Sequence, residues 1–578
     1  MINSQNIKSS FSWGLRVQII IPMSGYGERF RKVGYKVPKP LIEIDGKPIV
    51  AHIIDMFPGE KDFIFICNQE HLDDPSYHME AILNKYCPSG LVVGIAPHKL
   101  GPVHSVKQVE HLLDLQQPAI VNYCDFTCYF DWNHFKYFAK ETDCIGAVFA
   151  YRGFHPHSLG TTNYAYMVEK NGWVENIQEK KPYTNNRMEE FASSGTYYFA
   201  SAKIMVDSFT EVIAKNLNVG GEYYVSLAYK TLLTKKNLIA VYPLQHFMQW
   251  GTPEDVHEYN IWSKTFKGLI GDIQNNIFKN GARIIPMAGL GKRFLDAGYA
   301  KAKPLIRVSG LPMVAQAAND LPLTKHLIFV LRKDLPDYID TINELKKLYP
   351  RAIIKTINNV SNGQACTALI GLEALAKETE GFIDSITIGT CDSGVLYNHK
   401  VFNQLIKNNS ADVIVWGIRG HPNAIRNPTM YGWIDIDDKT ELIRSISVKK
   451  PLNSPKTDPI VLGIFTFRKP QYFRNALRSL IDRNGKINGE FYIDSLINDA
   501  IGLGLRCRFF EVDSFLCWGT PDDLLTFEYW QSCFHKWNNH PYRLELDKNI
   551  PVKEIRSLKA RYESKLPILP NIPNKTND

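Results

Sequence analysis

Two short segments of the chain carry glycine, arginine and lysine in the same order. Residues 21–44 read IPMSGYGERFRKVGYKVPKPLIEI, and residues 285–308 read IPMAGLGKRFLDAGYAKAKPLIRV. In each segment a loop of small residues follows an apolar run, and an arginine and then a lysine come after the loop. Glycines allow backbone N–H groups to approach phosphate oxygens, and arginine and lysine supply the opposing charge. This is the arrangement that a site for a nucleoside triphosphate needs.

The two segments belong to a repeat with a long period. The pairs Gly25/Gly289, Gly27/Gly291, Arg29/Arg293 and Lys39/Lys303 are each 264 residues apart. Later landmarks recur in the same order at nearly the same offset: Asp125 and Asp392, Lys180-Lys181-Pro182 and Lys449-Lys450-Pro451, Gly221-Glu222-Tyr223-Tyr224 and Gly489-Glu490-Phe491-Tyr492, and Trp250-Gly251-Thr252-Pro253 and Trp518-Gly519-Thr520-Pro521. Solenoid units are far shorter. The period therefore indicates two whole domains in tandem, each large enough for its own core.

The residues that we expect to neutralise phosphate charge are Arg29, Lys39, Arg293 and Lys303. A single Gly-x-Gly-x-Arg element is a weak signal, because glycine pairs occur in many turns, and lone Arg and Lys residues are often solvated surface charges. The duplication argues against that simpler interpretation. The loops that we expect to bind the triphosphate are Ser24, Gly25, Tyr26 and Gly27 in the first copy, and Ala288, Gly289, Leu290 and Gly291 in the second.

The elements that must position these residues alternate along the chain. Apolar runs at 17–23, 61–68 and 118–126 have the length and composition of buried strands, and the segments 47–57 and 105–115 have helical spacing. Strands that alternate with helices predict an α/β fold with a mostly parallel sheet. Ligands of such sheets bind beyond the carboxyl ends of the strands, so the loops after the first and third runs should face the site.

The repeat also predicts the domain boundaries. We expect a first domain at residues 1–266, which ends after the amphipathic segment 256–266, then a linker at 267–280 and a second domain at 281–535. Residues 536–578 form a C-terminal extension with scattered prolines and charges. The sequence leaves open whether this extension packs on the second domain or binds a partner.

Composition describes an ordinary globular protein. The 578 residues are 44% hydrophobic and carry a formal net charge of +8. This excess suits an anionic substrate, but no dense Lys/Arg run suggests binding to nucleic acid. The ten cysteines form no C-x-x-C pair, which argues against zinc. Because no signal peptide and no apolar stretch long enough for a bilayer is found, we expect a cytoplasmic protein without membrane contact.

The motif P-M-[SA]-G-x-G-x-R-F followed by K-P-L-I resembles the sugar-nucleotidyltransferase (nucleoside-diphosphate-sugar pyrophosphorylase) superfamily, in its capsule and surface-polysaccharide branch. The resemblance covers both copies. It implies a Rossmann-like, GT-A-like α/β domain with a mostly parallel mixed sheet in each copy, and Mg²⁺ as cofactor. It also implies an enzyme that joins an NTP to a phosphorylated sugar or small phospho-alcohol and releases pyrophosphate. Both substrates are then the partners of the protein, and homo-oligomerisation stays open.

The resemblance also assigns roles to individual residues. It implies base contacts at Gly101 in the first copy and at Gly363 and Gln364 in the second. It implies Mg²⁺ ligands at Asp125, Asp392 and Gln249. The residues that it implies for acceptor binding are Glu179, Lys180, Lys181 and Glu222 in the first copy, and Lys449, Lys450 and Glu490 in the second.

The chain departs from the family pattern at three of these places. A second aspartate ligand for Mg²⁺ is usual near the domain end, where this chain has Gln249 and Cys517. Glutamine still offers an oxygen, but a thiol is a poor ligand for a hard cation. The second copy also has Val448 where the first has Glu179. We therefore expect the two domains to differ in acceptor, or the second domain to react slowly.

Several questions stay open at the level of sequence. The overall resemblance favours CTP or UTP, but no residue fixes the base. A nucleotide-sugar-dependent glycosyltransferase and a nucleotide-binding regulatory or scaffold protein are the alternatives. The glycine-rich loop with its arginine and lysine suits a triphosphate better than a diphosphate sugar. It therefore favours the nucleotidyltransferase over the glycosyltransferase. The histidines His155, His157 and His421 lie between the landmarks, and we interpret them as residues of solvent-facing loops.

Overall fold

The computed structural model describes residues 16–161, 163–235, 238–244, 246–271, 278–379, 383–437, 439–566 and 568–570. The chain divides into two compact units, Met1–Tyr259 with Lys565–Asp578 (unit 1) and Asn260–Ser564 (unit 2). Part of the predicted linker, residues 272–277, lies outside the described residues. No helix in the described ranges has the length and apolar character needed to cross a membrane.

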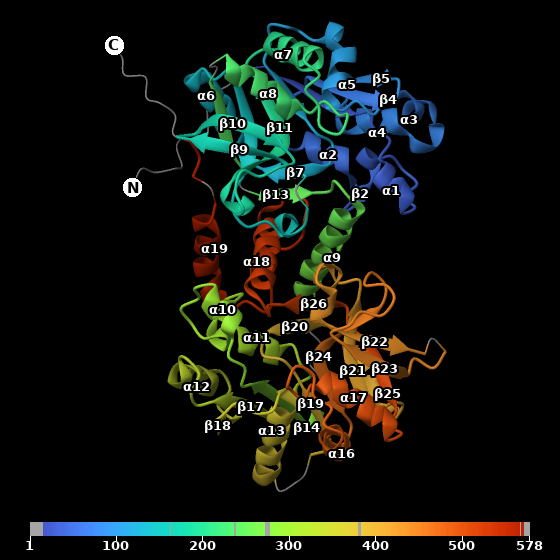
Figure 1. Ribbon diagram of the computed structural model, residues 1–578, viewed down its shortest axis with the longest axis vertical. Coiled ribbons are helices and arrows are strands. Elements are labelled where there is room, and N and C mark those ends of the chain that lie inside the picture. Colours follow the sequence, from blue (N-terminus) through green and yellow to red (C-terminus); the bar gives the residue numbers. More distant parts are fainter. Residues whose placement is uncertain are drawn as a thin grey trace. The chain divides into compact units, whose positions relative to one another are not determined.

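Unit 1 is built on a nine-stranded mixed sheet (Figure 1). In sheet order its strands are β5 (Leu91–Ile95), β4 (Phe63–Asn68), β1 (Gln18–Met23), β6 (Ala119–Asn122), β11 (Phe191–Phe199), β8 (Gly146–Tyr151), β12 (Ile239–Pro243), β10 (Trp173–Glu179) and β9 (Ala165–Lys170). Strand β1 runs parallel to both β4 and β6, so their carboxyl ends meet at one edge. Strand β11 is antiparallel to β6 and β8, which makes the sheet mixed.

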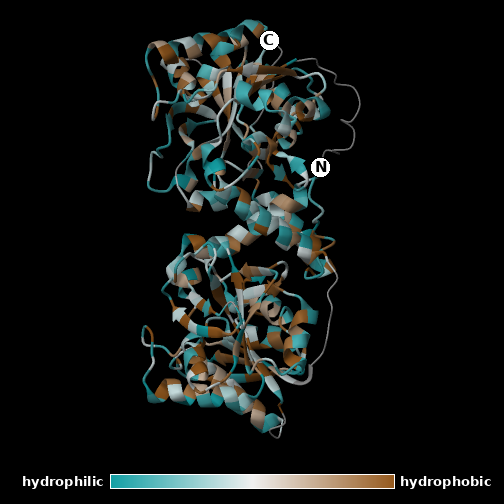
Figure 2. Cartoon of the chain, turned by 90° about the vertical axis from the view of Figure 1, so that its right-hand side faces the viewer, coloured by the Kyte–Doolittle hydropathy of each residue, from teal (hydrophilic) through white to brown (hydrophobic). Residues whose placement is uncertain are grey.

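Helices and short strands complete unit 1. They are α1 (Glu28–Lys32), η1 (Lys39–Leu41), β2 (Glu43–Ile44), β3 (Lys47–Pro48), α2 (Ile49–Ile54), α3 (Gln69–Asp73), α4 (Met79–Tyr86), α5 (Pro102–Gln108), β7 (Phe126–Tyr129), α6 (Trp132–Thr142), α7 (Ala202–Ala214), α8 (Val225–Thr234) and β13 (His246–Gln249). The helices carry both teal and brown residues in Figure 2, as expected where one helix face packs on a sheet and the other meets solvent.

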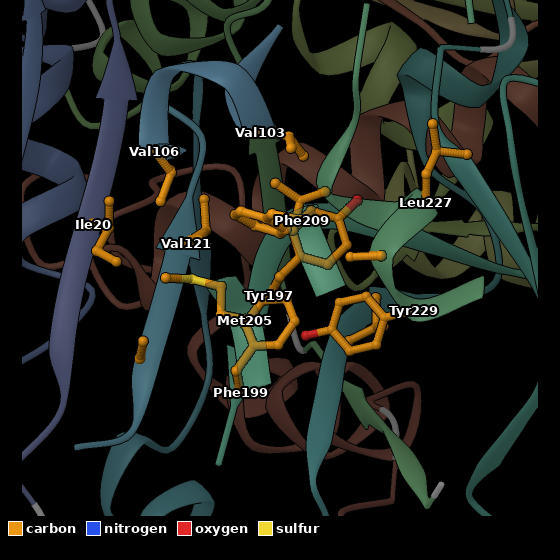
Figure 3. Packing of buried hydrophobic residues seen from close by; sticks show 14 of the residues in the cluster. Ile20, Val103, Val106, Val121, Tyr197, Phe199, Met205, Phe209, Leu227 and Tyr229 are labelled. Carbon is orange, nitrogen blue, oxygen red and sulfur yellow. The ribbon is translucent and has the colours of Figure 1, made fainter. Parts of the chain in front are cut away.

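One hydrophobic core of unit 1 lies between the sheet and helices α5, α7 and α8. Figure 3 shows Phe199 of β11 beside Tyr229 of α8, and these rings stack with centroids 4.9 Å apart. The buried Tyr229 hydroxyl donates a hydrogen bond of 2.5 Å to the carbonyl of Tyr198. The hydroxyl therefore has a partner and the aromatic body fills the core, as a buried tyrosine requires.

Unit 2 has a sheet with the same strand order. Its strands are β18 (Ile353–Ile357), β17 (Thr324–Arg332), β14 (Phe278–Met287), β19 (Ser385–Ile388), β24 (Pro459–Phe467), β21 (Val413–Arg419) and β25 (Cys507–Glu511), while β22 (Gly432–Ile436) pairs with β23 (Ile443–Val448) and β24. Each strand takes the place of its counterpart in unit 1, with β14 between two parallel neighbours as β1 is. The predicted fold class, α/β with a mixed Rossmann-like sheet in each half, is confirmed.

The remaining elements of unit 2 occur in a similar order to those of unit 1. They are α10 (Lys292–Asp296), η6 (Lys303–Leu305), β15 (Arg307–Val308), β16 (Leu311–Pro312), α11 (Met313–Asn319), α12 (Tyr338–Leu348), α13 (Gln364–Glu378), β20 (Ser393–Leu396), α14 (His399–Lys407), α15 (Pro422–Arg426), α16 (Pro470–Asp482), α17 (Ile493–Gly502), β26 (Ser514–Cys517), α18 (Pro521–Lys536) and α19 (Ile555–Ser564).

The division between the units falls inside helix α9 (Pro253–Leu269), whose second half belongs to unit 2. Phe266 on that half is fully buried, and its ring lies 5.5 Å from that of Phe527 and 4.8 Å from that of Tyr542. Tyr542 also donates a 2.7 Å hydrogen bond to Asp547. Residues 536–564 of the C-terminal extension are thus part of unit 2, and a cut after residue 266 would remove part of the core of that unit.

We expect Phe266→Ala to lower the free energy of unfolding of unit 2 by about 3–5 kcal/mol, because it removes a buried ring and leaves a cavity. Urea unfolding of the full chain, followed by tryptophan fluorescence, measures the change. Leu503→Ala is the control, since that side chain is 51% exposed and its loss should cost less than about 0.5 kcal/mol. Equal effects of the two substitutions would contradict the packing role of α9.

Candidate functional site

A cavity of about 500 Å³ opens in unit 1 beside the carboxyl ends of β1 and β6. Its lining brings together twelve residues that the sequence singled out: Ser24, Gly25, Tyr26, Gly27, Arg29, Lys39, Gly101, Asp125, Glu179, Lys180, Glu222 and Gln249. Lys181, which the sequence also singled out, is exposed and is not part of this lining. Residues far apart in the chain thus meet around one space large enough for small-molecule substrates.

The glycine-rich loop joins β1 to the short helix α1. Gly27 adopts a left-handed conformation with φ 63°, and a Cβ built there would lie 3.5 Å from Cβ of Lys39. The hydroxyl of Ser24 is buried and lies 2.9 Å from that of Ser105 on α5, which ties the loop to that helix. Arg29 is exposed on α1 at the cavity wall. The loop therefore presents its backbone and one guanidinium to the cavity.

An ion pair joins two residues of the cavity wall beside the glycine-rich loop. Lys39 begins η1, and its Nζ lies 2.7 Å from Oδ2 of Asp125, which follows β6. Their side chains are 18% and 32% exposed. The lysine Nζ also lies 5.9 Å from the ring centroid of the buried Phe30. The ammonium group is thus held in place at the cavity wall before any ligand arrives.

Gln249 and Asp125 converge on one spot. A Cβ built on Gly251 would lie 3.4 Å from Oδ2 of Asp125 and 3.3 Å from Nε2 of Gln249. That Nε2 donates a 2.9 Å hydrogen bond to Asp255, whereas Oε1 of Gln249 is buried and has no hydrogen-bond partner among the described residues. A carboxylate and an unpartnered amide oxygen are hard donors, so this pair of residues fits Mg²⁺.

Asp255 is a neighbour of this site that sequence reasoning missed. Its Oδ2 accepts hydrogen bonds from the backbone N–H and the hydroxyl of Thr252, at 2.8 and 2.7 Å, as well as from Gln249. Burial raises the pKa of this carboxyl. The signal in the sequence was its place three residues after Thr252, where the first turn of α9 begins. Asp255 orients the amide of Gln249 so that Oε1 of the glutamine remains without a hydrogen-bond partner among the described residues.

A chain of hydrogen-bonded polar side chains also lines the cavity. Lys180 donates to the hydroxyl of Tyr224 at 2.5 Å, and that hydroxyl donates to Oε2 of Glu222 at 2.9 Å. Glu179, at the end of β10, accepts a 2.5 Å hydrogen bond from the hydroxyl of Ser226. Lys180 itself has φ 59°, an uncommon left-handed backbone for a non-glycine residue. Such strain is concentrated at functional sites.

The segment expected to contact the base is tied to the segment that carries Glu222. The backbone N–H of Tyr223 donates to Leu100 at 2.9 Å, and that of Val103 donates to Tyr223 at 3.2 Å. Gly101 between them has φ 87°, and a Cβ there would lie 2.9 Å from the backbone nitrogen and oxygen of Tyr223. A side chain at this position would separate the two segments, so the glycine is required by contact as well as by conformation.

Unit 2 repeats the ion pair. Nζ of Lys303, at the start of η6, lies 2.5 Å from Oδ2 of Asp392 and donates to the carbonyl of Gly519 at 3.1 Å. Burial opposes ionisation of both groups, but the charge of Lys303 lowers the pKa of Asp392, and the charge of Asp392 raises the pKa of Lys303. Arg293 is exposed on α10, as Arg29 is on α1.

The glycine, base and acceptor segments of unit 2 follow those of unit 1. Gly291 of the loop formed by Ala288, Gly289, Leu290 and Gly291 has φ 62°. Gly363 has φ 114°, directly before Gln364 at the start of α13, and a Cβ on Gly363 would lie 2.6 Å from the nitrogen of Phe491. Lys449 has φ 55° and donates to Tyr492 at 3.1 Å, while Lys450 and Glu490 are exposed.

The two units carry different residues at the place expected for a second Mg²⁺ ligand. Cys517, at the end of β26, is buried, and burial raises the pKa of its thiol well above the usual range. A Cβ on Gly519 would lie 3.7 Å from this sulfur and 3.5 Å from Oδ2 of Asp392, so the thiol occupies the place that Gln249 has in unit 1. A protonated thiol is not a ligand for Mg²⁺.

The interpretation of the histidines as residues of solvent-facing loops was wrong for two of them. His155 and His421 are 6% and 1% exposed. The ring of His155 lies 4.3 Å from that of Tyr151, and burial lowers its pKa well below the usual range. Aromatic side chains that lie far away along the chain also cover these segments, Phe247 of β13 beside His155 and Phe515 of β26 beside His421, and such contacts are not visible in the local sequence.

Comparison with known proteins agrees with the predicted enzyme class. A family model described as "Nucleotidyl transferase" matches residues 18–226, so unit 1 carries a nucleotidyl transferase domain. The chain is similar to a mannose-1-phosphate guanyltransferase of Yarrowia lipolytica, with 26% identity over 164 residues, which cover 26% of this chain and 44% of the relative. It is also similar to a glucose-1-phosphate cytidylyltransferase of Salmonella typhimurium, with 33% identity over 78 residues, which cover 11% of this chain and 30% of the relative.

Among solved structures, the chain is similar to a nucleoside-diphosphate-sugar pyrophosphorylase from Vibrio cholerae. The identity is 21% and the TM-score is 0.35, and the similarity covers 42% of this chain and 98% of that one. The chain spans less than half the length of each of these two curated relatives.

Glu179 supplies a pH-dependent test of the site. Burial raises the pKa of Glu179 from 4.5 to about 7, so the folded protein keeps a proton that the unfolded chain releases in this range. The contribution of this residue to stability is therefore present below pH 4.5 and is lost as the pH rises toward 7. We expect Glu179→Gln to be more stable relative to wild type at pH 8 than at pH 5, by at most about 3 kcal/mol.

Urea unfolding at the two pH values measures this difference. Glu175→Gln is the control, because Glu175 lies exposed on the same strand. An identical pH dependence in the Glu179→Gln protein and the wild type would contradict the burial of a protonatable carboxyl at this place.

Proposed function

We propose that this protein is a nucleotidyltransferase that joins an NTP to a phosphorylated sugar or small phospho-alcohol and releases pyrophosphate. The single observation that carries the proposal is the cavity of unit 1, in which the glycine-rich loop with Lys39 and Asp125 faces the group formed by Glu179, Lys180 and Glu222. The first of these groups suits a triphosphate and the second a phosphorylated acceptor. The match to the nucleotidyl transferase family over residues 18–226 supports this assignment.

In the proposed reaction an acceptor phosphate oxygen attacks the α-phosphorus of the NTP. A P–O bond forms to the acceptor, the bond to the β-phosphate oxygen breaks, and its electron pair leaves with pyrophosphate. The loop N–H groups and Arg29 bind the triphosphate, and Lys39 neutralises the charge that develops on its oxygens. Lys180 holds the acceptor phosphate near the α-phosphorus. Positioning and charge neutralisation supply the rate, without a covalent intermediate.

The residues of unit 1 also fit the cofactor that the resemblance implies. Asp125 and Oε1 of Gln249 would hold Mg²⁺, which when bound polarises phosphate oxygens as a Lewis acid. Asp255 keeps the amide of Gln249 turned so that its oxygen is available, through the 2.9 Å hydrogen bond from Nε2. In unit 2, Cys517 supplies no such oxygen, so Asp392 would hold the ion with fewer protein ligands. This difference favours a slower reaction in unit 2.

The proposal covers more than one NTP and more than one phosphorylated acceptor. The names of the two curated relatives point to different bases, guanine and cytosine, and both name hexose 1-phosphates. We favour CTP or UTP and a role in the cytoplasm, where the product would supply activated precursors for capsule or surface polysaccharide. A panel of the four NTPs against hexose 1-phosphates and phospho-alcohols, with pyrophosphate release as the measurement, tests the proposal. No pyrophosphate with any pair would contradict it.

Lys39→Ala should lower the turnover of unit 1 by about 10²–10³-fold, because one preorganised cation at the transition state is lost. The measurement is pyrophosphate release by the full chain in a Lys303→Ala background, which isolates unit 1. Lys36→Ala is the matched control, since Lys36 is exposed and does not line the cavity. Near-normal turnover of the Lys39→Ala protein would refute the assigned role.

Asp125→Asn should remove the Mg²⁺-dependent activity of unit 1 while the fold stays intact, because the amide keeps the shape of the carboxylate and loses its charge. Two measurements check this: pyrophosphate release as a function of Mg²⁺ concentration, and binding of Mn²⁺ by electron paramagnetic resonance. Asp143→Asn, at an exposed position after α6, should change neither. An unchanged Mg²⁺ requirement in the Asp125→Asn protein would show that Asp125 has only a structural role.

A further inference from the structure

The acceptor end of unit 1 takes its carboxylate from a strand. Glu179 is the last residue of β10 and pairs with Ala165 of β9 in the sheet register. The hydroxyl of Ser226, the second residue of α8, donates to this carboxylate at 2.5 Å. Lys180 follows directly, in its left-handed conformation. In unit 1 the strand therefore supplies the acid and the helix supplies the hydroxyl.

Unit 2 carries three different residues at the equivalent places. The last residue of β23 is Val448, which pairs with Gly432 of β22. The second residue of α17 is Asp494, where α8 has its serine. Lys449 follows Val448 with φ 55°, so the backbone turns as it does in unit 1. The strand has lost the acid, and the helix has gained one.

The glycine of β22 makes room for this aspartate. A Cβ built on Gly432 would lie 2.4 Å from Oδ2 of Asp494, which is closer than real Cβ atoms approach an oxygen. The corresponding residue of unit 1 is Ala165, which has such a Cβ, and the place of Asp494 is taken there by Ser226, which is smaller than aspartate. The three exchanges therefore fit one another: the strand acid becomes valine, the helix serine becomes aspartate, and the alanine methyl group is removed to admit the carboxylate.

We propose that Asp494 is the acceptor-binding carboxylate of unit 2 and replaces Glu179 in a second acceptor site built around Lys449. The ligand class is a phosphorylated compound with neutral hydroxyl groups, to which the carboxylate accepts hydrogen bonds while Lys449 binds the phosphate. Because the acid projects from a helix rather than from a strand, it reaches a different hydroxyl, and the two units select different acceptors. This inference rests on the proposed nucleotidyl transfer.

The electrostatic environments of the two carboxyls are alike. Burial raises the pKa of Asp494 to about 6, and the charge of Lys449 opposes the rise. Burial raises the pKa of Glu179 to about 7, and Lys180 opposes it in the same way. Each acid is thus half-buried beside a lysine whose backbone is in the left-handed conformation and whose ammonium group donates to a tyrosine hydroxyl.

The test uses the full chain with Lys39→Ala, so that pyrophosphate release reports unit 2. The acceptors are glucose 1-phosphate, mannose 1-phosphate, myo-inositol 1-phosphate, glycerol 3-phosphate and phosphocholine, each with all four NTPs. Asp494→Asn should raise KM for the preferred acceptor by about tenfold or more, because a charged hydrogen-bond acceptor is lost. KM for the NTP should not change, and the thermal unfolding temperature should not fall.

A rescue variant separates ligand binding from folding. The triple substitution Gly432→Ala, Val448→Glu, Asp494→Ser rebuilds the arrangement of unit 1, and it should restore acceptor binding or shift the preference toward the acceptor of unit 1. An acceptor KM that is unchanged by Asp494→Asn would overturn this inference alone and leave the proposed function standing. No turnover by unit 2 with any acceptor, in a chain whose unit 1 is active when Lys39 is intact, would overturn the inference and confine the proposed function to unit 1.

Discussion

An ion pair between a lysine and an aspartate, formed once in each unit, is the interaction on which the sites depend. Lys39 and Asp125 are 2.7 Å apart, and Lys303 and Asp392 are 2.5 Å apart. In each case the lysine comes from a short helix after the glycine-rich loop, and the aspartate follows the strand beside the first one. The pair thereby fixes two loops over the carboxyl ends of parallel strands. Removal of either partner would leave the other charge unpaired and half-buried, which is costly.

The parts of this arrangement that lie at strand ends could be predicted from the sequence. Apolar runs that alternate with helical spacing gave the α/β fold, and the duplication distinguished Lys39 and Asp125 from ordinary surface charges. Ser226 and Tyr224 could not be predicted in the same way, because they act on residues more than forty positions away along the chain. The backbone bonds between Leu100 and Tyr223 are likewise a product of the folded chain.

Helix α9 shows a second limit of the sequence pattern. Its amphipathic spacing predicted a closing helix for the first domain, yet Phe266 packs on aromatic residues of α18 and of the C-terminal extension. A repeat identifies where similar segments begin, but the partner of a buried ring is fixed only by tertiary packing. Tertiary packing also determines what a departure from the repeat means. Val448 alone predicted a different acceptor or a slow reaction in the second domain, whereas the structure places the carboxylate of Asp494, on a neighbouring helix, against Gly432.

The central claim is that each unit has its own triphosphate site built around its lysine–aspartate pair. Isothermal titration calorimetry of the full chain with α,β-methylene analogues of the NTPs, in the presence of Mg²⁺, tests it most directly, because these analogues bind without transfer. We expect two nucleotides per chain, with the affinity of one site weakened by a substitution of Lys39 and that of the other by a substitution of Lys303. Binding of a single nucleotide per chain, with an affinity that a substitution of Lys303 does not change, would contradict the account.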